Sequence, residues 1–465
     1  MNPNINCKRR RLASLLLAGM AGSALGGWSG APLAQTHQHA HAAAFAAISG
    51  DENRVVVLTS YPEELSSRFQ KAFEQRYPGK RVEILWRQSA DALAYLRRGG
   101  DHEVDVYWTS APRNFALLKA EGRFAKLALD SEALPGTLAG FPISDPDGYF
   151  AAFELAGYGI AYNPAAVKKL GLPPPEDWRD LAHPAYRGQV QLPIPGRVGF
   201  APVLIEAVLQ GYGWTEGWAV LAGIANNASF NSGDSTPDSD DVVTGRKAAR
   251  MTIDFFAAPA QRTVHPDAPL AFVYPPKTAY NPSQVGIFAA APHPVAAREF
   301  VDFVLSAEGQ ELLLDPDVRR LPARKEIYAR HPEVSVHPFA PDNLAYSDAI
   351  RRARQGLVAT LFEVALVAPH QTAAPLWRKL HRAEQENPGN AADHRAARAL
   401  LTAIPLTDAA QQDAALRHLF DFPDRIPNQP DPPPTAERLA IEAEWQADVT
   451  ARLDKAKRLL EQIPL

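Results

Sequence analysis

Two copies of one short motif place hydroxyl groups where two predicted strands end. The apolar run 55–58 leads into Thr-Ser-Tyr-Pro at 59–62, and the run 104–108 leads into Thr-Ser-Ala-Pro at 109–112. A hydroxyl residue followed by proline is typical of the start of a helix. Each copy therefore predicts a strand-to-helix turn. In an open α/β sheet such turns lie at the edge where ligands bind, and free helix N–H groups there favour anions or polar oxygens.

The elements around these turns predict an α/β core followed by a helical region. From Arg54 onward, apolar strands alternate with amphipathic helices, which predicts a parallel sheet. Residues 150–162 form a long extended candidate interrupted by glycines, and a second α/β region follows. In the last segment, helical spacing of apolar residues is clearest after Thr435, where the expected buried face consists of Trp445, Val449, Leu453, Ala456, Leu460 and Ile463.

Length and charge limit the class of protein. A chain of 465 residues is expected to form two or three domains. The formal net charge of −4 lacks the basic excess that nucleic-acid binding requires, so no nucleic-acid partner is expected.

The N-terminus predicts export. Four basic residues at 8–11 precede an apolar stretch at 12–25 and small residues that suit cleavage near Ala31 or Ala34, as in a secretory signal peptide. The only cysteine, Cys7, would leave with this signal. The exported chain is then expected to hold no disulfide, no thiolate metal site and no cysteine nucleophile. We expect a periplasmic protein.

Motifs for catalysis are missing from the sequence. It contains no Gly-x-Ser-x-Gly elbow, no His-Glu-x-x-His, no Walker loop and no glycine-rich dinucleotide fingerprint. We therefore expect no enzyme, no cofactor and no resident metal. A hydrolase with a triad of scattered Ser, His and Asp is the rival hypothesis, and turnover of an ester and phosphoester panel would support it.

Several stretches resemble one family, the periplasmic solute-binding proteins of ABC importers, in the cluster that includes ferric-iron and phosphoglycerate binders. They are residues 55–62, 105–112, 157–164, 245–256 and 281–310. The last is the most specific, because Ala-Pro-His-Pro-Val-Ala-Ala at 291–297 and Phe-Val-Asp-Phe-Val-Leu-Ser-Ala-Glu-Gly-Gln at 300–310 match a typical pattern of such proteins. Leu-Pro-Ala-Arg at 321–324 also fits. The resemblance covers roughly residues 52–330.

This resemblance implies a two-lobed, type II Venus-flytrap fold with a C-terminal helical extension. The expected divisions are a signal peptide at 1–34, a leader at 35–50, lobe 1 at 51–155, lobe 2 at 156–255, a return to lobe 1 at 256–342 and the extension at 343–465. The extension is either a cap packed on the lobes or a docking surface for a partner protein.

The resemblance also implies ligand-binding residues in the loops that face the cleft. They are Ser60, Tyr61, Ser110, Ala111, Arg197, Ser232, Ser235, Thr236, Tyr274 and Tyr280. Each has a plainer alternative, such as helix capping for Ser60 and Ser110, a surface ion pair for Arg197 or core packing for Tyr274. No adjacent tyrosine pair, which ferric binders commonly use, is present.

The expected solute is therefore a small organic anion, with ferric iron held by Tyr274 and Tyr280 as the alternative. The expected partner is a membrane ABC permease. A second hypothesis is a regulatory subunit that reports solute occupancy to a membrane sensor kinase, as phosphoglycerate-type relatives do.

Overall fold

The first sheet forms where the sequence alternates apolar strands with amphipathic helices. The computed structural model describes residues 53–231, 241–255, 270–316, 318–334, 336–421 and 433–463. β1 (Arg54–Thr59) pairs in parallel with β2 (Arg81–Trp86) and with β3 (Val106–Thr109). The helices α2 (Glu63–Arg76), α3 (Ser89–Arg97) and α4 (Pro112–Ala120) follow these three strands. The predicted βαβαβ pattern is confirmed, and the signal and leader at 1–50 lie outside the described residues.

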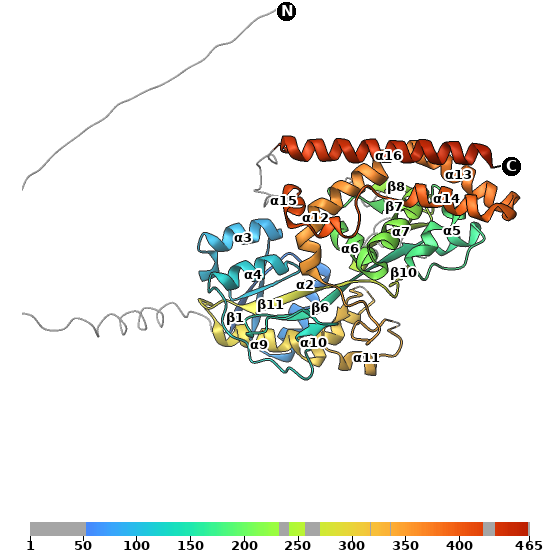
Figure 1. The fold of residues 1–465 in the computed structure, drawn as a ribbon. Helices are drawn as coiled ribbons and strands as arrows, with labels where there is room; N and C mark the ends of the chain where they lie inside the picture. Colours follow the sequence, from blue (N-terminus) through green and yellow to red (C-terminus); the bar gives the residue numbers. More distant parts are fainter. Residues whose placement is uncertain are drawn as a thin grey trace, which may run out of the picture. The chain divides into compact units, whose positions relative to one another are not determined.

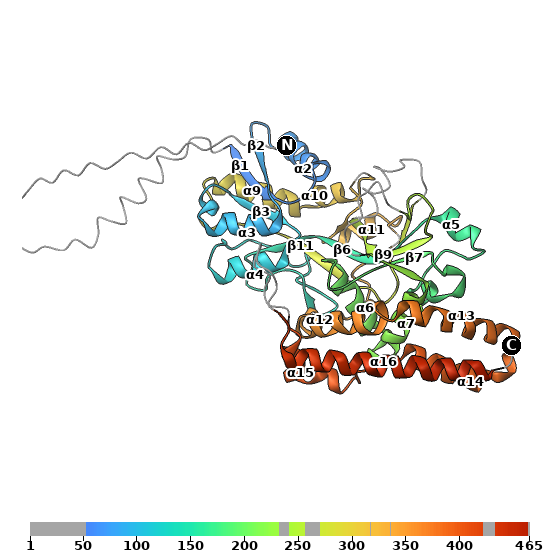
Figure 2. The same ribbon diagram turned by 90° about the horizontal axis from the view of Figure 1, so that it is seen from above.

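One long strand joins this sheet to a second half. β6 (Ala151–Tyr162) pairs through its first part with β11 (Tyr280–Ile287) and β12 (Leu321–Pro322), and through its last part with β9 (Ala249–Ile253) and β10 (Ala271–Val273). The path of the sheet is β2-β1-β3-β11-β6-β9-β7-β8, and the two views together show its strands (Figure 1 and Figure 2). We call the half that contains β1 lobe 1 and the half that contains β9 lobe 2.

The strand β11 departs from the expected parallel arrangement. It returns to lobe 1 and lies antiparallel between β3 and β6. β10 still pairs with the lobe 2 part of β6, so the return crossing lies between Val273 and Tyr280, later than the boundary at 256 predicted from the sequence. Apolar runs of similar length predicted both strands, but such runs do not specify which neighbour a strand pairs with.

Helices cover both faces of lobe 1. α2 and α9 (Pro294–Leu305) pack on one face with Phe69, Trp108 and Phe300 in a common core, and α3 and α4 pack on the other. The hairpin β4 (Thr137–Leu138) and β5 (Phe141–Pro142) borders the first core. The short helices α10 (Ala307–Glu311) and α11 (Glu326–Arg330) follow α9. This arrangement leaves the strand ends of β1, β2 and β3 at one edge, where α2, α3 and α4 begin.

The motif around α9 and α10 acts by joining distant backbone segments. Ser306 caps α10 by accepting a hydrogen bond from Gly309 N at 3.1 Å. The side chain of Gln310 donates to the Phe153 carbonyl in β6 at 2.6 Å and accepts from Ala323 N at 2.8 Å. Through these contacts the motif holds β6 and the backbone at Ala323 in place.

Lobe 2 shares its core with the C-terminal helices. The lobe contains β7 (Val190–Pro193), β8 (Ala228–Asn231), α5 (Pro164–Lys169), α6 (Ala201–Tyr212) and α7 (Trp214–Asn227). The C-terminal helices are α12 (Asp348–Phe362), the π-helix η6 (Glu363–Val367), α13 (His370–Glu386), α14 (Ala391–Thr402), α15 (Ala414–Leu419) and α16 (Ala436–Gln462). Residues of both sets, including Trp218, Leu361, Trp377 and Trp445, form one apolar cluster.

Polar contacts fix these C-terminal helices to lobe 2. A buried ion pair joins Arg354 of α12 to Glu206 of α6 at 2.6 Å, and Trp214 Nε1 donates to the Leu406 carbonyl at 3.0 Å. α16 lies along α13 and α14, on the α6 and α7 side of the sheet (Figure 2). Its buried face is the one predicted from the sequence, because Trp445, Val449, Leu453, Ala456, Leu460 and Ile463 are all buried.

No single helix in the described part of the chain is long and apolar enough to cross a membrane. The pair 348–367 and 370–386, bent by 61°, meets the criteria of length and composition only when taken together. Its apolar residues, such as Leu357, Phe362 and Leu380, lie in the lobe 2 core.

Candidate functional site

The strand ends of lobe 1 bring the two hydroxyl motifs together. Thr59 at the end of β1 lies in register with Trp86 of β2 and Trp108 of β3. The Ser60 and Thr109 hydroxyls are hydrogen-bonded to each other, and Ser110 is the next residue along this edge. The partner hydroxyl Thr109 belongs to the second motif but was not among the predicted site residues.

Neither serine caps its helix. The residues that precede α2 and α4 are Pro62 and Ala111, and neither makes a side-chain capping bond. Gln88, which precedes α3, makes none either. The first N–H groups of a helix have no acceptor one turn earlier, so α2 and α3 present donors along one sheet edge. α4 presents fewer, because Pro112 has no N–H and Asn114 N donates to the Ala111 carbonyl. The first turns of α2 and α3 contain acids, whereas that of α4 contains none.

A buried polar cluster lies where β6 passes from lobe 1 to lobe 2. Glu154 of β6 accepts hydrogen bonds from Tyr61 Oη at 3.0 Å and Ser283 Oγ at 2.8 Å. It also forms an ion pair with Arg320 at 2.7 Å. The other oxygen, Oε2, is buried without a hydrogen-bond partner. We call Tyr61, Glu154, Ser283, Arg320, Asp254 and Tyr274 the crossover cluster.

Asp254, one residue past the end of β9, forms the lobe 2 side of this cluster. Its Oδ2 accepts from Gly157 N at 2.7 Å and from Tyr274 Oη at 3.0 Å, while Oδ1 is buried and unpartnered. Burial raises the pKa of Asp254 to about 7. Among the described residues, the buried Arg320 forms an ion pair only with Glu154, although its charge also acts on Asp254 and offsets part of the effect of burial on that pKa.

Tyr274 and Tyr280 lie next to each other and pack as a pair of rings, as the plainer alternative for Tyr274 expected. Their centroids are 6.2 Å apart with an angle of 27° between the planes. Burial raises the pKa of both phenols above the ordinary value, and the carboxyl of Asp254 adds to the effect. Gly157 makes room for them, because a Cβ there would lie 2.4 Å from a ring carbon of Tyr274.

The remaining predicted residues are placed as follows. Arg197 is 51% exposed and forms an ion pair with Glu363 of η6 at 2.9 Å, as its plainer alternative expected. Ala111 is buried at the start of α4. Ser232, Ser235 and Thr236 lie outside the described residues. The role of all these residues toward a solute stays a prediction.

Sequence reasoning missed Glu154, Asp254, Ser283 and Arg320. A signal was present for the first, because Glu154 stands alone inside the apolar run 150–162. A buried carboxylate in such a run requires a partner. The partner itself, 166 positions along the chain, leaves no trace in the local pattern.

The chemistry of this region is that of recognition. Hydroxyls, backbone N–H groups and a buried guanidinium suit oxygen-rich or anionic groups. Within the described ranges, no group of three or more His, Cys, Asp or Glu side chains is placed to hold a metal ion.

Comparisons with known proteins agree with this fold. A family model described as "Bacterial extracellular solute-binding protein" matches residues 106–338. The "Phosphoglycerate transport regulatory protein PgtC" of Salmonella typhimurium is 28% identical over 354 residues, which cover 75% of this chain and 85% of that protein.

Two solved structures are similar to this chain. The Trichodesmium protein IdiA (FutA), in complex with iron and citrate, is 15% identical with a TM-score of 0.50, and the match covers 67% of this chain and 98% of that one. The periplasmic binding protein AfuA of Actinobacillus pleuropneumoniae, with fructose-6-phosphate bound, is 22% identical with a TM-score of 0.45 over 58% of this chain and 85% of that one. At such identities the first match shows the two-lobed fold alone.

Proposed function

Because this chain belongs to the bacterial extracellular solute-binding proteins, we propose that it captures a small organic anion outside the cytoplasm and delivers it to the membrane permease of an ABC importer. Export through the segment 1–34 into the periplasm is part of this proposal. The proposal also includes that the protein does not convert its solute, since hydroxyls and backbone N–H groups that can bind a solute lie at the strand-end edge.

One observation supports an anion most directly. Three helices begin without side-chain caps at the edge where Ser60 and Ser110 lie. The helix dipoles and the N–H groups at the starts of α2 and α3 stabilise negative charge there. α4 contributes through its dipole, because its first turn has no acid that would repel an anion, although Pro112 at its start has no N–H.

The relative named for phosphoglycerate transport regulation narrows the class of solute. Its name, together with the donor-rich edge, favours a phosphorylated or carboxylated molecule. Iron is less favoured at Tyr274 and Tyr280, because the sequence has no adjacent tyrosine pair and the two phenol rings pack against each other. Because the similar Trichodesmium structure contains iron and citrate, the experiment below also distinguishes bound iron from a bound organic anion.

Capture is proposed to proceed by hinge closure at the crossing strands. β6 and the segment between β10 and β11 cross between the two halves of the sheet, and the chain passes from lobe 1 to lobe 2 again between α11 and α12. Tyr61 reaches from the strand-end loop to Glu154 in β6, so the edge and the crossing are mechanically linked. Solute at the edge would therefore favour one relative position of the lobes over the other.

Native mass spectrometry of residues 35–465, purified after export, tests the proposal first. An adduct with the mass of a small phosphorylated or carboxylated anion is the expected result. An adduct of one iron would instead contradict the anion assignment. A bare chain would direct the test to a thermal-shift screen, in which a bound solute raises the melting temperature by mass action.

Substitution of both serines then tests the site. In the Ser60→Ala/Ser110→Ala double variant we expect solute affinity to fall at least tenfold, because each lost hydrogen bond to a charged group is worth about 1.5–3 kcal/mol. Isothermal titration calorimetry gives the dissociation constants. Ser131→Ala, at an exposed position after the edge, is the matched control. Unchanged affinity in the double variant would place the solute elsewhere.

A regulatory subunit is the second candidate function, favoured by the same relative's name. The two candidates differ in what happens when this protein is removed from a strain that makes the permease constitutively. Solute uptake is lost if the protein delivers solute. Uptake persists, and only solute-dependent induction is lost, if the protein is a sensor.

A further inference from the structure

A small open pocket lies beside the strand-end edge, on lobe 1. Its volume is about 300 Å³, and it is lined by Trp86, Arg87, Gln88, Asp91, Ala94 and Arg98. The lining comes from the end of β2 and from α3. Arg87 N donates to the Thr59 carbonyl at 2.9 Å, so the backbone at the pocket is fixed next to Ser60.

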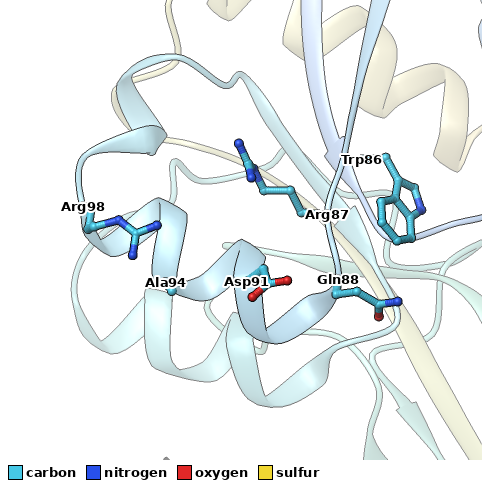
Figure 3. Close-up of a pocket in the computed structure, with 6 residues that line it drawn as sticks. All are labelled: Trp86, Arg87, Gln88, Asp91, Ala94 and Arg98. Atoms are coloured by element: carbon cyan, nitrogen blue, oxygen red, sulfur yellow. The ribbon is translucent and has the colours of Figure 1, made fainter. Parts of the chain in front are cut away.

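Two arginines supply the pocket's charge. Figure 3 shows the guanidinium groups of Arg87 and Arg98 on the same side of the strand, with Asp91 below Arg87, whereas Trp86 and Gln88 point away from them. Neither arginine has a carboxylate within ion-pair distance among the described residues, Asp91 included. By contrast, the adjacent Arg97 pairs with Glu121 at 2.6 Å.

Arg87 is held in position by contacts that are not ionic. Its guanidinium lies 4.3 Å from the centroid of the Tyr95 ring, and Nε is buried without an acceptor. Tyr95 is itself fixed by a hydrogen bond to Glu103. Gly100 allows this arrangement, because a Cβ there would lie 2.4 Å from the Tyr95 ring. A guanidinium oriented in advance loses less entropy when it binds an anion.

We propose that this pocket binds the phosphate group of a small phosphorylated solute, as an extension of the strand-end site. This inference rests on the proposed function. Two guanidinium groups with no carboxylate partner among the described residues match a dianionic phosphate, and Arg forks bind phosphate oxygens in bidentate fashion. The single acid, Asp91, lies in the first turn of α3, where the helix dipole stabilises it.

Inorganic phosphate is the first probe, at fixed ionic strength, with the Arg Nε–H signals of the exported chain followed by NMR. We expect the Arg87 and Arg98 signals to shift and saturate. Arg87→Gln and Arg98→Gln should each weaken phosphate binding at least tenfold. Arg97→Gln removes the same charge from the same helix outside the pocket, so it should change binding less than twofold. Arg98 is exposed, so its variant is expected to stay folded, and melting curves check this.

Wild-type phosphate affinity in both pocket variants would overturn the inference. An equal loss of affinity in Arg97→Gln would also overturn it, because phosphate would then respond only to the net positive charge of this region. The serine double variant separates this inference from the proposed function. If that variant loses a phosphorylated solute such as 3-phosphoglycerate while both pocket variants retain it, the pocket inference fails and the proposed function stands. If no variant and no wild-type chain binds an organic anion, the proposed function fails, and the phosphate titration still decides whether the pocket binds phosphate.

Discussion

Two buried carboxyl groups, Glu154 and Asp254, lie on either side of the point where β6 changes lobes. Only one of them, Glu154, forms an ion pair with the buried cation Arg320. Burial disfavours a second negative charge, which is why the pKa of Asp254 is raised to about 7 while its oxygen still accepts the Gly157 and Tyr274 hydrogen bonds. Ionising the buried Asp254 carboxyl therefore costs free energy in the folded chain.

Asp254 predicts a specific dependence of stability on pH. In the unfolded chain its pKa is about 3.9, so between about pH 4 and pH 7 only the folded chain keeps the proton. The unfolded state then binds fewer protons, and the contribution of Asp254 to the free energy of unfolding falls as pH rises through this window.

The variant Asp254→Asn removes this contribution and keeps a hydrogen-bond acceptor. We expect it to be more stable than the wild type by about 4 kcal/mol at pH 8, which corresponds to about three pKa units at about 1.4 kcal/mol each, with the difference vanishing near pH 4. Urea unfolding at a series of pH values measures this. The exposed Asp393→Asn in α14 is the control and should show no such trend. A stability difference that does not depend on pH would contradict the assignment.

At the scale of elements, the connection between the lobes depends on how closely β6 approaches β10 and Tyr274, the residue that follows β10. Gly157 and Gly159 leave space for Tyr274 and for the Val273 carbonyl, and any side chain at either position would overlap them. Tyr274 cannot move away easily, since its ring packs against Phe272 and Tyr280 and its hydroxyl is bonded to Asp254. These glycines therefore permit the crossing itself.

We expect Gly157→Ala to destabilise the fold by about 2 kcal/mol, the usual cost of overpacking a filled site. It should also weaken solute binding, because it moves Tyr274 and Asp254 at the crossing. Gly136→Ala is the matched control, since a Cβ there meets nothing within 4 Å. Thermal melts and calorimetric titration report the two effects. Equal melting temperatures for the two variants would show that the crossing tolerates a methyl group.

At the scale of the whole molecule, the C-terminal helices are part of lobe 2 rather than an attachment to it. Their apolar residues and those of α6 and α7 form one core, and the buried Glu206–Arg354 pair spans the junction. Of the two alternatives for the extension, packing on a lobe is therefore observed. Docking to a partner through its outer face stays a prediction.

Removal of residues 343–465 is consequently expected to damage lobe 2. The shortened chain should aggregate or bind a hydrophobic dye such as ANS, and its melting temperature should fall by more than 10 °C, because a large apolar surface becomes exposed and Glu206 loses its partner. Leu439→Ala, at a 50% exposed position of α16, is the control and should change stability by less than about 0.5 kcal/mol. A soluble, cooperatively melting shortened chain would contradict the shared core.

The sequence by itself determined the local features and the family-like segments. The paired Thr-Ser-x-Pro turns, the βαβαβ order and the buried face of α16 all follow from spacing within a few residues. Tertiary structure alone decided the antiparallel return of β11, the late crossing after β10 and the ion pair between Glu154 and Arg320. It also decided that Arg97 forms an ion pair with Glu121, whereas Arg87 and Arg98 have no carboxylate partner in the described part of the chain. The physical reason is that periodicity shows which face of an element is buried, whereas the partner that covers that face, or neutralises a charge on it, comes from a distant part of the chain.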